Sequence, residues 1–107
     1  MNKIILLVND QVAFDFDKEL SLEESQLEFL DKMDSDMDKG VKINGQLFSE
    51  PDNKQRATFM TMNLIRALQQ ENQMVATASC AYIASRLPDV EKVLVSDDGA
   101  GVKVEFI

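Results

Sequence analysis

Apolar residues recur every three or four positions between Ala57 and Leu68, and this spacing predicts a helix. Asp52 and Gln55 have the form of a capping box, with Pro51 just before them, so we place the helix at residues 53–71. The predicted helix is apolar over more than half of its circumference. We therefore expect a sheet and a second helix to cover it on two sides.

A second helix is predicted directly after the first. Residues 69–73 contain no apolar side chain and interrupt the pattern, and Pro88 disfavours helix in the residue before it. Between these two boundaries we place a helix at residues 75–87, packed against the first helix. Its apolar face comprises Ala76, Cys80, Ile83, Ala84 and Leu87.

The N-terminal segment predicts strands. Residues 3–8, KIILLV, are apolar after the lysine and without alternation, which is typical of a strand covered on both faces or of a central strand. Residues 12–17 then alternate apolar with small or acidic side chains. This pattern fits either a short edge strand or an extended arm that presses Phe14 and Phe16 onto the core.

An amphipathic helix is predicted at residues 22–38. Ser21 and Glu24 have the form of a capping box at its start, and Gly40 is a suitable C-terminal cap. One stripe is apolar apart from Gln26, and the opposite stripe is mostly acidic. The opposite stripe consists of Glu24, Glu28, Asp31, Ser35 and Asp38.

Two hairpins complete the predicted elements. Asn44-Gly45 is the preferred dipeptide for a type I′ turn and would join strands at residues 41–43 and 46–48. Strands at residues 91–96 and 102–106 flank a loop that contains two glycines. The resulting order predicts a single α+β domain over residues 1–107, with a small mixed or antiparallel sheet and about three helices packed mainly on one face.

Composition removes several kinds of chemistry. The chain of 107 residues has no histidine and one cysteine, Cys80. Histidine-dependent nucleophiles, imidazole acid–base catalysis and a tetrahedral zinc site are therefore excluded, and no cofactor is expected. The position of Cys80 on an apolar helix face predicts a buried structural thiol. An enzyme that uses carboxylates alone is the weakest hypothesis, because no pair of acidic groups with clearly different environments can be named.

The negative charge is concentrated in one part of the chain. Residues 10–38 contain eleven acidic side chains and two lysines, a local net charge of −9 in a chain whose formal total is −8. Such a surface disfavours nucleic acid, whose phosphates require basic groups. A protein with a basic surface, or a cation, is the natural complement.

The aspartates at the end of the acidic helix suggest a cation site as an alternative. Alternate carboxylates at Asp34, Asp36 and Asp38 could bind a divalent cation, although the segment lacks the glycine and the glutamate of an EF-hand loop. Without a cation, these aspartates lie unfavourably at the negative end of the helix. Either the helix ends near Met33 or a positive group lies close by, from a partner or from within the fold. The candidates within the fold are Lys39, Lys42, Arg56, Arg66 and Arg86.

Taken together, these patterns favour a binding protein over an enzyme. No apolar run approaches the roughly 18 to 20 residues that a membrane span needs, so we expect a cytoplasmic protein with no membrane partner. The first hypothesis is an accessory or regulatory protein that binds a basic protein surface through the acidic face of the helix at 22–38. The residues of that face are Glu24, Glu28, Asp31, Asp34 and Asp38.

Overall fold

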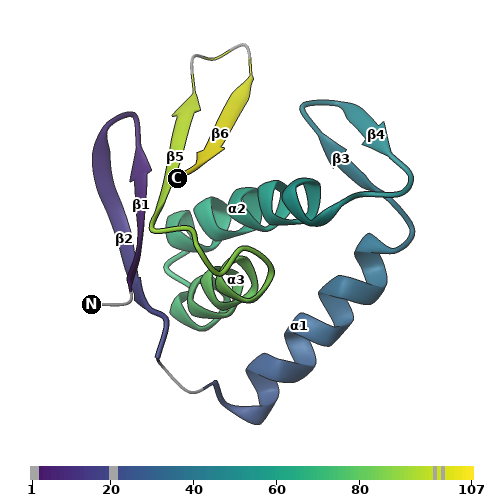
Figure 1. Cartoon of the computed structure of the whole chain (residues 1–107), viewed down its shortest axis with the longest axis horizontal. Coiled ribbons are helices and arrows are strands. Elements are labelled where there is room, and N and C mark those ends of the chain that lie inside the picture. The colour runs from purple at the N-terminus through teal and green to yellow at the C-terminus, as the bar shows by residue number, and fades with distance from the viewer. Residues whose placement is uncertain (1–2, 20–21, 98, 100) are drawn as a thin grey trace.

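The computed structural model describes residues 3–19, 22–97, 99 and 101–107 (Figure 1). The described elements, in chain order, are β1 (Lys3–Val8), β2 (Gln11–Asp17), α1 (Glu24–Met37), β3 (Val41–Ile43), β4 (Gln46–Phe48), α2 (Asn53–Gln69), α3 (Gln73–Arg86), β5 (Lys92–Asp97) and β6 (Val102–Phe106).

The larger sheet has four strands in the order β2-β1-β5-β6. β1 and β5 pair in parallel at its centre, and each forms an antiparallel pair with the strand at its outer side. β3 and β4 form a separate two-stranded sheet. Figure 1 shows α2 and α3 beside the four-stranded sheet, with α1 beyond them. The predicted α+β class, with a small mixed sheet and three helices mainly on one face, is confirmed.

The strand pairings decide the two alternatives at the N-terminus. β1 is a central strand, and residues 12–17 belong to an edge strand that is paired with β1 along its length. Phe14 and Phe16 lie opposite Leu6 and Ile4, on the helix side of the sheet. The pairing shifts by one residue between Leu6 and Leu7: Leu6 pairs with Phe14, but Leu7 pairs with Val12. This irregularity interrupts the strict alternation of β2.

One apolar core joins the sheet to the helices. α2 and α3 pack closely against each other along their length, as the sequence predicts. The fully buried large side chains of the core come from both layers and are Ile4, Leu6, Val93, Met60, Leu64, Tyr82 and Ile83, with Met37 from α1. Burial of this apolar surface is the main force that holds the layers together.

Helix boundaries differ from the predicted ones by one or two residues. α1 begins at Glu24 rather than at residue 22, because Gln26 accepts a hydrogen bond from the backbone N–H of Glu23 and so fixes the first turn there. Ser21, the predicted cap, lies outside the described residues. α2 ends at Gln69 and α3 already begins at Gln73, because Asn72 accepts a hydrogen bond from the N–H of Val75.

The β3–β4 hairpin has the predicted turn. Asn44 and Gly45 both have positive φ angles, of 52° and 80°, as a type I′ turn requires. The side-chain amide of Asn44 also donates to the carbonyl of Val102 at 2.7 Å and accepts from its N–H at 3.0 Å. The tip of the hairpin is thereby attached to the start of β6.

Within the described residues, no helix has the length and apolar character needed to cross a lipid bilayer.

Leu64 tests the packing of α2 on the core. Leu64 is fully buried, whereas Leu47 on β4 is 61% exposed. We expect Leu64→Ala to lower the free energy of unfolding by about 2–5 kcal/mol, because it removes buried methyl groups and leaves a cavity. Leu47→Ala, the matched control, should change it by less than about 0.5 kcal/mol. Urea unfolding followed by circular dichroism measures both, and equal effects would contradict this packing.

Candidate functional site

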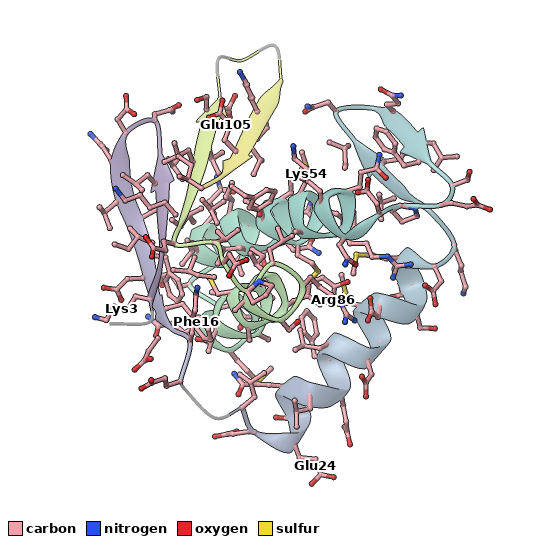
Figure 2. All side chains as sticks on the ribbon, viewed as in Figure 1. Lys3, Phe16, Glu24, Lys54, Arg86 and Glu105 are labelled. Carbon is pink, nitrogen blue, oxygen red and sulfur yellow. The ribbon has the colours of Figure 1, made fainter. Side chains whose placement is uncertain are left out.

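Asp34, near the end of α1, is the centre of a network of charged and polar side chains. One carboxylate oxygen, Oδ1, lies 2.9 Å from Nη1 of Arg56 and accepts a hydrogen bond of 2.6 Å from the hydroxyl of Tyr82. The other oxygen, Oδ2, pairs with the guanidinium of Arg86. Figure 2 shows Arg86 in the space between α3 and α1. Asp34 therefore connects its own helix to both of the other helices.

Arg56 extends the network at the first turns of α2. Its Nη2 atom lies 2.6 Å from Oδ1 of Asp38, and its Nη1 also donates to the backbone carbonyl of Asp34 at 3.3 Å. Its Nε donates to the carbonyl of Pro51, also at 3.3 Å. Arg56 thus binds two aspartates and one backbone carbonyl of α1 while its own side chain is only 18% exposed.

The structure shows how the negative charge of the aspartates at the end of α1 is compensated. The helix continues to Met37 and does not end near Met33. Arg56 and Arg86, two of the five cations considered from the sequence, compensate the negative charge from within the fold. Charge-assisted hydrogen bonds of this kind are about twice as strong as neutral ones.

The network changes the protonation of its members. Burial by itself would raise the pKa of Asp34, but the hydrogen bonds from Tyr82 and Arg56 and the charge of Arg86 outweigh it and lower the pKa. Burial, together with the hydrogen bond to Asp34, raises the pKa of Tyr82. Asp34 is therefore ionised and Tyr82 is a neutral donor at physiological pH.

The structure places the three aspartates of the candidate cation site in different surroundings. Among the described residues, no three or more cysteine, aspartate or glutamate side chains are grouped so that they could hold a metal ion. Asp34 and Asp38 are bound to arginines instead, and Asp36 is exposed.

The remaining members of the predicted acidic face point to solvent. Glu24, Glu28 and Asp31 are exposed, and Figure 2 shows Glu24 directed away from the body of the molecule. Asp38 is 66% exposed although it is paired with Arg56. Asp34 is half-buried and faces the other helices. Its contacts with them hold α1 in position, and it is not itself part of the exposed surface.

Leu27 lies on the same exposed side of α1 and was not part of the predicted site. Its side chain is 51% exposed, between Glu24 and Asp31 in the helical sequence. Its spacing within the helix could have identified it, because Leu27 lies beside the apolar stripe rather than within it. The exposed surface of α1 therefore combines negative charge with one large apolar side chain.

Cys80 is a structural residue, as the sequence predicts. It is 1% exposed, and burial raises the pKa of its thiol to about 12. A thiolate nucleophile is therefore not available at neutral pH.

The described surface also contains a groove of about 190 Å³ between the three helices, which Phe29, Met33, Arg66 and Val75 help to line.

Comparison with known proteins gives no relative: no protein-family model, no curated protein and no solved structure matches the chain. The geometry of α1 and its surroundings is therefore the basis for the function proposed below.

The lowered pKa of Asp34 predicts a pH-dependent contribution to stability. Since this pKa is lower in the folded chain than in the unfolded chain, the network stabilises the fold above about pH 4, and this stabilisation is lost as the pH falls through the lowered value. We expect Asp34→Asn to lower the free energy of unfolding by about 2 kcal/mol at neutral pH. Denaturant unfolding at several pH values should show the difference from wild type shrinking below about pH 4.

Asp36→Asn is the matched control, since it removes the same charge from the same helix at an exposed position. It should change the free energy of unfolding by less than about 0.5 kcal/mol. If Asp34→Asn and Asp36→Asn had equal effects at neutral pH, the network would not be a source of stability.

Proposed function

We propose that this chain is a cytoplasmic accessory or regulatory protein that binds a basic surface of another protein through the exposed face of α1. Glu24, Glu28, Asp31 and Asp38 would form the charged rim of the contact. The observation that carries the proposal is the concentration of charge: residues 10–38 have a net charge of −9, and the side chains named here are exposed to solvent.

Electrostatic attraction would act mainly on the rate of encounter. Exposed charges of one sign raise the association rate with a partner of opposite sign, by up to about 10²–10³-fold at low salt. Each exposed ion pair adds little to the final affinity, about 0–1 kcal/mol. The proposal therefore includes an association rate that falls steeply as ionic strength rises.

Leu27 would supply the apolar part of the contact. Interfaces bury apolar side chains at their centre and leave charged groups at the rim. Leu27 has charged residues at the neighbouring exposed positions Glu24, Glu28 and Asp31. A partner with an apolar depression surrounded by lysine or arginine side chains would complement this surface.

Asp34 has a different role in this proposal from the one that its sequence position suggests. Its carboxylate is already bound by Arg56, Arg86 and Tyr82, so a partner would have to break these contacts to reach it. We therefore assign Asp34 to the positioning of α1. The alternative function, binding of a divalent cation, is not favoured, since arginines already bind two of the three carboxylates that it would need, Asp34 and Asp38.

A triple charge reversal tests the proposal. We expect Glu24→Lys, Glu28→Lys and Asp31→Lys together to reduce recovery of a bound protein from a native lysate by at least about tenfold, because attraction becomes repulsion. The measurement is affinity capture with quantitative mass spectrometry. The purified partner then allows the association rate to be measured at increasing salt.

The control for total charge is a second triple variant, Glu50→Lys, Glu71→Lys and Asp89→Lys, at exposed positions outside α1. It changes the net charge by the same amount and should leave capture nearly unchanged. Circular dichroism verifies that both variants are folded. Equal recovery with the two variants and the wild-type protein would contradict a binding face on α1.

A further inference from the structure

The four-stranded sheet has a second face, on the side away from the helices, and apolar side chains cross it. Because Ile4 and Leu6 are buried under the helices, the alternating residues Ile5 and Leu7 of β1 point to the other side. Register places Leu94 of β5 beside Leu7 on the same side. We call this side of the sheet the outer face.

Both edges of the sheet add an exposed apolar residue to the outer face. Val12 of β2 pairs with Leu7 across the register irregularity, and Ile107 exchanges two backbone hydrogen bonds with Lys92. Their exposed fractions are 67% and 60%, the first and third highest among the exposed large apolar residues of the described chain. The apolar side chains of the outer face are therefore Val12, Ile5, Leu7, Leu94 and Ile107.

The composition of β1 is unusual for this position. A strand with one solvated face normally alternates apolar and polar residues, whereas β1 reads as a strand that is covered on both faces. Within the described residues, the helices cover one face and no helix or strand covers the other (Figure 1). Covering of the outer face by another molecule would account for Ile5 and Leu7.

The charges around the outer face indicate which molecule would fit. The strand register places three lysines and three acidic residues on it, and Asp10 lines a depression on the same side, so its net charge is only −1 although the whole chain has a net charge of −8. Figure 2 shows Lys3, at the start of β1, directed away from the helices. The six residues are Lys3, Lys92, Lys103, Asp15, Asp17 and Glu105.

We propose that the outer face is the contact between two copies of this chain. A nearly neutral surface that contains both signs of charge can be complementary to itself across a two-fold axis, whereas the acidic face of α1 cannot. α1 lies on the far side of α2 and α3 from the sheet (Figure 1). In such a dimer the two acidic helices are separated by both molecules, well beyond the Debye length of about 8 Å at physiological salt.

The outer face is small for a contact between two proteins. Four strands about 4.8 Å apart and about 18 Å long give a surface of roughly 350 Å² per copy, about half of the usual 800 Å² per partner. Contacts below the usual size are typical of weak, transient complexes, so we expect a dimer that forms only at high protein concentration. It does not depend on the proposed binding of a basic protein by α1.

Sedimentation velocity of the full chain from about 10 µM to about 1 mM tests the proposal. The wild-type protein should shift from monomer to dimer over this range. Val12→Glu with Ile107→Glu should raise the dissociation constant by at least about tenfold, because the contact would then bury four additional negative charges. Both side chains are already exposed, so the fold should be retained.

Leu47→Glu with Met74→Glu is the matched control, since both residues are large, apolar and exposed, and neither lies on the outer face. It adds the same charge and should leave the dissociation constant within about threefold of wild type. A wild-type chain that remains monomeric at about 1 mM overturns the proposal. Equal weakening of the dimer by the control variant and the outer-face variant also overturns it. Binding of a different protein to the outer face, without self-association, overturns it as well.

Discussion

The binding of Asp34 by Arg56, Arg86 and Tyr82 is the interaction on which the position of α1 depends. α1 carries most of its charge at exposed positions, and its C-terminal half would be unfavourable if the aspartates had no partners. The two arginines come from the start of α2 and the end of α3, so one carboxylate joins three helices. Met37, fully buried nearby in the sequence, adds apolar contact with the core. The network thus holds the acidic side of α1 toward solvent.

The two surfaces proposed for binding differ because the layers of the fold place them apart. The sheet faces outward with a nearly neutral, partly apolar surface, and α1 faces outward with an acidic one (Figure 1). α2 and α3 lie between them and supply most of the core. Self-association through the sheet would leave both acidic helices accessible, so a dimer would present two identical acidic surfaces. Two linked sites raise the apparent affinity for a partner that can bind both.

Sequence patterns predict most of this fold because its elements have strong local signals. Hydrophobic spacing locates α2 and α3, and Asn44-Gly45 specifies its turn. The sequence also indicates that the aspartates near residue 34 need a positive partner, but five cations were possible. The choice of Arg56 and Arg86 depends on how three helices pack, which is a tertiary property. The register irregularity that places Val12 on the outer face likewise depends on strand pairing and has no local signal.

Native-state hydrogen exchange of wild type and Asp34→Asn tests most directly whether one carboxylate positions α1. The account predicts that protection of the backbone amides of α1 falls by about tenfold or more, while the amides of α2 and of β1 keep theirs relative to global unfolding. The amides of α1 report on the network because Arg56, Arg86 and Tyr82 join this helix to α2 and α3. Unchanged protection of α1, or an equal loss in all elements, would contradict the claim that Asp34 holds this helix in place.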